Sequence, residues 1–163
     1  ARTPSARPCQ RRVSDTLSDR TATGRNIVAM LFATPSLALD TLADWRWPHF
    51  AAIELACNCA GRYCAGRYWH DPAFLDALED LRARAGHRPL IVTSGHRCAQ
   101  WNAAVGGAPR SMHKTIAADI SLAGHDRERF EAAARVAGFT GIGLAARFIH
   151  LDRRARPARW TYT

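Results

Sequence analysis

Two stretches of this chain, SMHKTIAADIS at residues 111–121 and FIHLD at residues 148–152, carry the pattern that decides the fold. The second stretch alternates between polar and aliphatic residues, which predicts a strand with one chemical face and one buried face. Residues 117–122 alternate in the same way and place Asp119 on the polar face. Two short strands of this kind could bring an imidazole and a carboxylate together.

A catalytic zinc ion needs three protein ligands and one position left for water. His113, Asp119 and His150 supply the two imidazoles and one carboxylate of such a set. By spacing alone, a histidine near an aspartate is more often a surface pair or a buried structural histidine, and the chain has seven histidines. The motifs around these residues favour the metal site over that alternative.

Four segments resemble, in the same order, the M15 zinc D-Ala-D-Ala peptidases: SGHRC at 94–98, NAAVGGA at 102–108, the Ser-x-His segment that begins at Ser111, and FIHLD at 148–152. The resemblance covers about residues 47–162. It implies an α+β protein of the hedgehog/DD-peptidase fold, in which a small antiparallel sheet carries a zinc site and helices pack on one face. It also implies that the zinc ligands are His113, Asp119 and His150.

The chain departs from the family pattern in two places. The step from His113 to Asp119 is one residue shorter than usual, and Ile116 stands roughly where a glycine is expected. Several family members carry an acidic general base three residues before the last histidine, where this chain has Arg147. Asp152 is then the nearest carboxylate on the polar face, so we predict that it acts as the general base.

Arg97 and Ser111 are the candidate substrate-binding residues. A guanidinium group can hold a carboxylate through two hydrogen bonds, and the resemblance implies that Arg97 binds the terminal carboxylate of a peptide ending in D-alanine. The alternative for Arg97 is a surface salt bridge. Ser111 is expected either to fix the ligand loop or to bond the substrate.

The 163 residues carry a formal net charge of +9, nearly all of it from arginine, since Lys114 is the only lysine. Such a charge favours polyanions: nucleic acid, an anionic membrane, or a bacterial wall. The chain lacks both a basic stripe with interleaved aromatics and a recognition-helix motif, so we expect no specific nucleic-acid partner. The longest apolar run, residues 27–33, is too short to span a membrane; it could resemble a signal peptide core or be a short buried or interfacial segment.

Residues 1–29 are rich in arginine and poor in large apolar side chains, which predicts a disordered basic arm. Residues 30–163 are predicted to form a single peptidase domain, since their number suits one core, and to act as a monomer.

Three helices are predicted: one that begins at Thr34, with proline at an early position, and runs to about Ala43; one with Asp71 as an acidic N-cap; and one that begins at residues 124–126, before an amphipathic run. A buried strand is predicted over residues 89–94 from its branched side chains, and further strands are predicted over 141–144 and 159–162. Two tryptophans, at 45 and 47, are expected to pack onto the core in preference to lining the substrate groove.

The chain has five cysteines, an awkward number for a disulfide framework: Cys9, Cys57, Cys59, Cys64 and Cys98. The last four could form two disulfide bridges, remain free thiols, or hold a structural metal ion. Only one spacing resembles a zinc knuckle, so disulfides or free thiols are favoured over structural zinc.

These patterns predict a zinc-dependent D,D-carboxypeptidase that hydrolyses peptidoglycan stem peptides. The alternatives are a peptidoglycan endopeptidase of a phage-type lysis or tail apparatus, a non-catalytic wall-binding module with a structural zinc, and a polyanion-binding protein that uses the arginine-rich arm. We expect the protein to act at the bacterial cell envelope, in the periplasm or after export or delivery by a phage, although no clear signal peptide is present.

Overall fold

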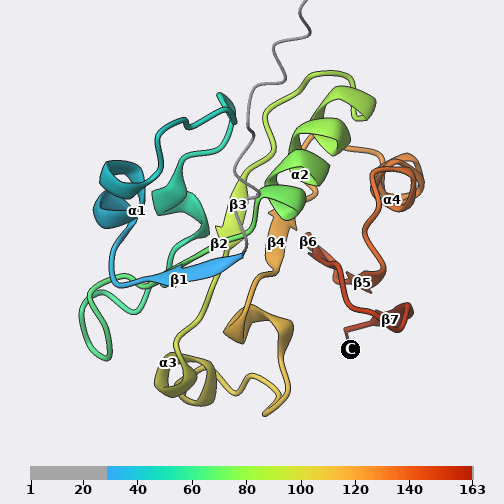
Figure 1. Ribbon diagram of the computed structural model, residues 1–163. Helices are drawn as coiled ribbons and strands as arrows, with labels where there is room; N and C mark the ends of the chain where they lie inside the picture. Colours follow the sequence, from blue (N-terminus) through green and yellow to red (C-terminus); the bar gives the residue numbers. More distant parts are fainter. Residues whose placement is uncertain (1–28, 163) are drawn as a thin grey trace, which may run out of the picture.

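The computed structural model describes residues 29–162. The predicted disordered arm therefore lies, except for its last residue, outside the described residues. The helical and strand elements follow one another along the chain as β1 (Met30–Phe32), α1 (Pro35–Thr41), η1 (Ala52–Leu55), β2 (Tyr68–His70), α2 (Pro72–Arg84), β3 (Val92–Ser94), α3 (Ala99–Ala104), η2 (Met112–Lys114), β4 (Ala118–Ser121), α4 (Arg127–Val136), β5 (Gly141–Leu144), β6 (Phe148–Asp152) and β7 (Ala158–Thr161). Figure 1 labels the helices and strands of this order.

The five-stranded sheet has the strand order β3-β4-β6-β5-β7. Its first three pairs are antiparallel, as expected, and the α+β class is confirmed. The pair β5–β7 is parallel, which the sequence did not predict. The short connection after β6 reverses the chain, and β4 already occupies the free edge of β6, so β7 pairs with β5 instead.

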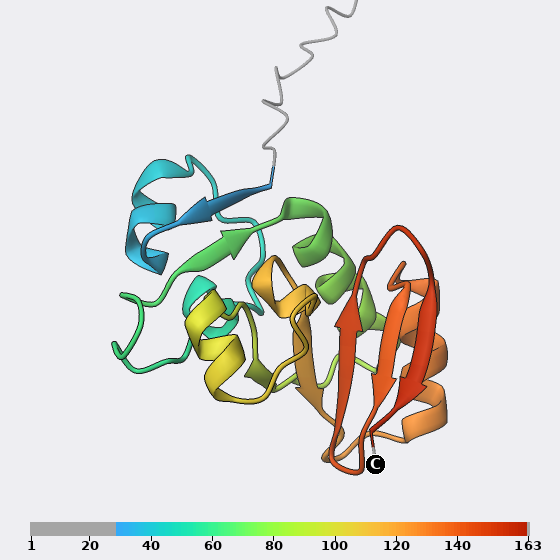
Figure 2. The same cartoon turned by 90° about the horizontal axis from the view of Figure 1, so that it is seen from below.

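Helices α2 and α4 contact each other and cover the apolar face of this sheet. Figure 2 looks at the sheet with α4 behind its strands. The core joins leucines of α2 and Phe130 of α4 to aliphatic residues of β4, β5 and β6, including Ile120 and Ile149, which are completely buried. Burial of this face leaves the opposite face of the strands free to carry polar side chains.

The predicted helix starts are confirmed by their caps. The side chains of Thr34, Asp71 and Asp126 each accept a hydrogen bond from a backbone N–H in the first turn of α1, α2 and α4, respectively. Helix α2 ends before Gly86, whose φ of 84° is a left-handed conformation that glycine adopts without strain.

Strand β3 is not buried as predicted. It lies at the edge of the sheet, and Ile91 just before it is 58% exposed, while Leu90 is buried. Branched residues are typical of strands, but they do not distinguish a central strand from an edge strand.

A second sheet of two strands, β1 and β2, lies with α1 beside the main sheet (Figure 1). Part of the apolar run 27–33 forms β1, in which Phe32 is buried and the other two residues are exposed. Trp47 is 2% exposed and packs into the core, as predicted, and its Nε1 donates to Asp76 Oδ1 at 2.8 Å. Within residues 29–162, no helix has the length and apolarity needed to cross a bilayer.

Candidate functional site

Strands β4 and β6 bring Asp119 and His150 together. The two residues are directly opposite each other in the antiparallel register, and both side chains lie on the face away from the helices. His113 reaches the same point from η2, a single 3-10 turn that is capped by Ser111. The three residues predicted as metal ligands are therefore adjacent in space.

The ligand atoms of this group form a tight triangle. His113 Nε2 and His150 Nδ1 lie 3.1 Å and 2.9 Å from Asp119 Oδ1, and 3.0 Å from each other. All three side chains are at least nine-tenths buried. A tetrahedral zinc centre with ordinary bond lengths has about 3.3 Å between its ligand atoms, so the triangle matches the size of such a centre.

Each imidazole is oriented by its other nitrogen. His113 Nδ1 donates to the backbone oxygen of Gly95 at 2.6 Å, and His150 Nε2 donates to Asp152 Oδ2 at 2.9 Å. Because carbonyl and carboxylate oxygens only accept, these bonds keep a proton on the outer nitrogen of each ring. His113 Nε2 and His150 Nδ1 then face Asp119; they donate to it when they are protonated and can bind a metal ion when they are not.

The electrostatics of the group favour an ionised Asp119. Burial alone would raise the pKa of its carboxyl, but hydrogen bonds from His113 and His150 outweigh burial and hold that pKa well below its usual range. Burial lowers the pKa of His150, and the carboxylates of Asp119 and Asp152 more than reverse this effect, so the pKa is raised. The site is thus a buried carboxylate between two imidazole nitrogens, and such a group of side chains can also bind a metal cation.

Asp152 lies on the other side of the His150 ring from Asp119. Its carboxylate binds His150 Nε2 and the guanidinium of Arg154, and its side chain is completely buried. It does not line the pocket at the site. This position differs from the one expected of a general base, which must reach a water molecule or the substrate.

Two glycines of β5 make room for this arrangement. Gly141 is paired with Asp152 and Gly143 with His150. A Cβ at Gly141 would overlap the Asp152 carboxylate, and one at Gly143 would lie 2.5 Å from the ring of Trp160. That ring packs on His150, with 5.2 Å between centroids, and Arg154 lies over it.

Arg97 contacts the site through Asp119. Its Nη2 donates to Asp119 Oδ2 at 2.8 Å and its Nε donates to Ser94 Oγ at 2.9 Å. The structure thus places Arg97 in the pocket, partly buried and paired to a candidate ligand. Ser111 also lines the pocket, and its hydroxyl accepts a hydrogen bond from the backbone N–H of His113 at 3.3 Å.

The shortened ligand loop still closes. After η2, Thr115 turns the chain with a φ of −112° and a ψ of −100°, and Ile116 is buried in the core. His96 supports this turn, since its Nδ1 donates to the Thr115 oxygen at 2.8 Å. Arg147 is exposed in the β5–β6 turn and does not line the pocket.

A pocket of about 450 Å³ opens over the ligand triangle, and its walls come from the segments around α3, η2, β6 and β7. Within the described part of the chain, three arginines and a single carboxylate line it: Arg97, Arg110, Arg154 and Asp119. The aromatic side of the pocket contains Phe148, Trp160 and Tyr162. An anionic group therefore suits this pocket better than a cationic one.

Sequence reasoning missed several residues of this site: Gly141, Gly143, Arg154 and Trp160. The Gly-x-Gly pattern of residues 141–143 is a visible signal, because glycine within a strand marks a close approach of other atoms. The pairing of these glycines with β6 and β7 could not be read from the chain.

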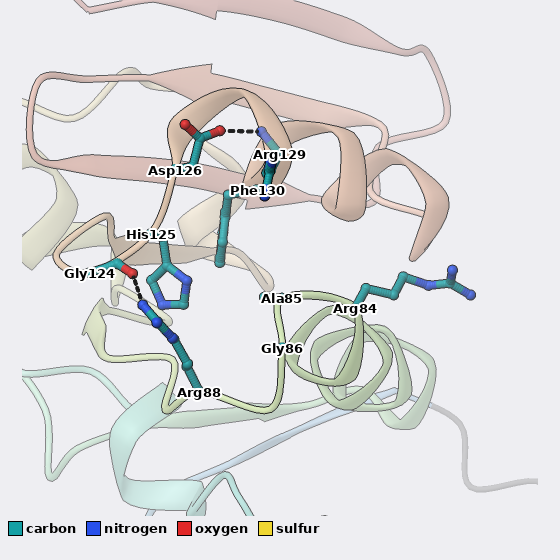
Figure 3. A pocket seen from close by; sticks show the side chains of 9 residues that line it. All are labelled: Arg84, Ala85, Gly86, Arg88, Gly124, His125, Asp126, Arg129 and Phe130. Atoms are coloured by element: carbon teal, nitrogen blue, oxygen red, sulfur yellow. Dashed lines mark hydrogen bonds between the residues drawn. The ribbon is translucent and has the colours of Figure 1, made fainter.

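A second hollow, of about 370 Å³, lies where the end of α2 meets the start of α4 (Figure 3). Arg88 crosses it to donate to the Gly124 oxygen at 2.5 Å, and Asp126 is used as the cap of α4. Within residues 29–162, neither group of side chains that could hold a metal ion lies in this hollow.

In the comparison with known protein families, the family described as Peptidase M15 matches residues 48–152. This segment contains the three candidate ligands, Arg97 and Asp152. No curated protein matches the chain.

Proposed function

This chain belongs to the M15 peptidase family, a family of zinc metallopeptidases that act on peptidoglycan, and we propose that its own reaction is the removal of the C-terminal D-alanine from stem peptides. The observation that carries the proposal is the arginine-lined pocket directly over the ligand triangle. The terminal carboxylate of a D-Ala-D-Ala peptide is the anionic group for which such a pocket is suited.

The donor set fits zinc. Two neutral imidazole nitrogens and one carboxylate, at the spacing described above, are a three-ligand set typical of catalytic zinc. When bound, zinc supplies a Lewis acid that polarises a carbonyl group and lowers the pKa of water. His113, Asp119 and His150 would hold the ion.

The roles of the surrounding residues follow from their contacts. Gly95 and Asp152 orient the two imidazoles, so we assign Asp152 a positioning role in place of the general-base role predicted from the sequence. Arg154 neutralises the buried Asp152 carboxylate, and the Trp160 ring keeps water from the outer face of His150.

Arg97 is the proposed anchor for the substrate carboxylate. Two of its nitrogens are occupied by Ser94 and Asp119, and its Nη1 makes no hydrogen bond with any described residue. Arg110 lines the same pocket and makes no ion pair within residues 29–162. Together they place N–H donors in the pocket that opens over the triangle.

One observation favours a second candidate function. Asp119 is the only carboxylate among the described pocket residues, and Arg147 lies outside the pocket, so no free acidic base faces the triangle. A wall-binding module with a structural zinc has no need of one. We propose the bacterial cell envelope as the place of action for either function, since the peptide substrate is there.

The test compares one pentapeptide stem ending in D-Ala-D-Ala as a free acid and as a C-terminal amide. We expect chelator-sensitive release of D-alanine from the acid and much slower cleavage of the amide. Arg97→Lys should reduce the preference for the acid, because lysine keeps the charge but its single nitrogen cannot replace the separate bonds of the guanidinium group to Ser94, to Asp119 and to the substrate. Arg153→Lys, at an exposed neighbour of Arg154 outside the pocket, is the matched control and should keep the preference.

Equal cleavage of acid and amide, with fragments released from whole peptidoglycan, would establish an endopeptidase instead. Binding to peptidoglycan with one zinc per chain and no hydrolysis of any substrate would establish the wall-binding module.

A further inference from the structure

A second group of metal-ligating side chains lies away from the histidine pocket. Three cysteines come from the loop between η1 and β2, and the fourth, Cys98, caps α3 about forty residues later. The four Sγ atoms all lie within 4.8 Å of one another. Cys57, Cys59 and Cys98 are buried, and Cys64 is half-buried.

The sulfur separations match one shared ion better than two disulfides. The Cys59 and Cys64 Sγ atoms are 3.6 Å apart, whereas a disulfide bond is about 2.05 Å long. A tetrahedral ion with four Zn–S bonds of about 2.3 Å requires about 3.8 Å between sulfurs. In the structure these four cysteines are free thiols. The two disulfide bonds that the sequence left open as an alternative are not formed.

Backbone N–H groups point at three of the four sulfurs. The amide of Cys98 donates to Cys57 Sγ at 3.3 Å, that of Arg67 to Cys64 Sγ at 3.4 Å, and that of Trp101 to Cys98 Sγ at 3.4 Å. Such bonds stabilise the thiolate form that binds metals.

The loop between η1 and β2 turns so that the sulfurs of its cysteines point toward one another. Ala60 and Gly61 have φ values of 55° and 78°, in the left-handed region, and the Arg62 amide donates to the Cys59 oxygen at 3.1 Å. Alanine is uncommon in that region, so another interaction must hold the turn. A shared ion between Cys59 and Cys64 would do so.

We propose that this chain binds a second zinc ion in a closed structural site made of four thiolates: Cys57, Cys59, Cys64 and Cys98. All four ligand positions are filled by protein, so the ion has no place for water or substrate. Zinc is the metal for which a single tetrahedral thiolate site of this size is typical.

The site ties the loop after η1 to the wall of the histidine pocket. Cys98 directly follows Arg97, whose backbone N–H donates to the His113 oxygen at 2.6 Å. Gly95, three residues before Cys98, orients the His113 ring. The ion therefore positions both Arg97 and a candidate zinc ligand without touching the substrate.

The experiment measures zinc and iron per chain in the full protein purified under reducing conditions, for the unmodified chain and for variants. We expect two zinc ions in the unmodified chain. Cys64→Ala should lose one, and Cys64→His should keep both, because histidine can replace one cysteine in a structural zinc site. Cys9→Ala, at the cysteine outside the described residues, controls for the loss of a thiol.

A second set of measurements distinguishes the two zinc sites. His150→Ala should lose the other zinc and keep the one at the cysteines, so failure of the proposed peptidase function leaves this proposal testable. Cobalt substituted into His150→Ala should show intense sulfur-to-metal charge-transfer absorption. Adding Cys64→Ala to the His150→Ala chain should abolish that absorption.

The proposal is overturned by one zinc in both the unmodified chain and Cys64→Ala, or by thiol titration that finds two disulfides in the metal-free folded chain. Iron at the cysteines in place of zinc overturns the choice of metal. If Cys64→Ala fails to fold, the content of the unmodified chain and the cobalt spectrum of His150→Ala still decide the matter.

Discussion

The histidine triangle and the cysteine cluster are both buried sets of metal-ligating side chains, but they differ in what surrounds them. The triangle is open on one side to a pocket of about 450 Å³, and its ligands are two imidazoles and a carboxylate. The cysteine cluster lines neither hollow, and its four sulfurs complete a closed set. A catalytic zinc site keeps one coordination position open for water or substrate, whereas a structural zinc site has all four positions filled by protein ligands.

The two regions also differ in how their geometry is fixed. Asp119 and His150 are held by strand register and by a core that includes Ile120 and Ile149. Three of the cysteines lie on the loop between η1 and β2, and the proposed second zinc ion would hold this loop in place. We therefore expect a chelator to leave the sheet folded while it loosens the loop after η1.

The largest effect should come from His150→Ala. Removal of a ligand should abolish zinc binding at the triangle and lower hydrolysis by more than about 10³-fold. Zinc analysis and D-alanine release measure the two effects, and the zinc at the cysteines should remain. His49→Ala, which removes an exposed ion pair with Glu79, is the control. An active His150→Ala would remove the distinction between the two regions.

Asp152→Asn should have a smaller effect. It keeps the shape of the side chain but weakens the orientation of His150 and leaves Arg154 without its ion pair, so zinc affinity or activity should fall by about 10–100-fold. Zinc titration measures the affinity. Asp80→Asn removes only an exposed pair with Arg84 and should change neither quantity. Unchanged zinc affinity combined with lost turnover would restore Asp152 as the general base.

Gly141→Ala tests the space behind the triangle. The added Cβ overlaps the Asp152 carboxylate, so we expect a loss of about 1–3 kcal/mol in the free energy of unfolding and weaker zinc binding. Denaturant unfolding measures the first. Thr161→Ala, on the exposed side of β7, should stay within about 0.5 kcal/mol. An unaffected Gly141→Ala would mean that Asp152 can move without cost to His150.

The smallest effect concerns a region that neither metal touches. Asp71→Ala removes the cap that holds the Phe74 N–H at 3.1 Å and should lower the stability by about 1 kcal/mol. Zinc content should not change, which would show that modest destabilisation does not release either ion. Loss of zinc from this variant would contradict the assignment of separate, locally fixed sites.

Local sequence patterns predicted much of the fold. The alternation in residues 117–122 and 148–152 placed Asp119 and His150 on polar strand faces, and an early proline, an acidic N-cap and an amphipathic run indicated where three helices start. Both signals depend only on periodicity and on neighbouring backbone groups, so they can be read from the chain.

Other features were decided by contacts between distant segments. The edge position of β3, the parallel pairing of β7 and the burial of Asp152 against Gly141 depend on which strands become neighbours. The meeting of Cys98 with the cysteines of the η1–β2 loop is a contact of the same kind. The periodicity of a strand or helix determines the direction in which a side chain points. Its contacts with residues about forty positions away are determined only by how the strands and loops pack in the tertiary structure.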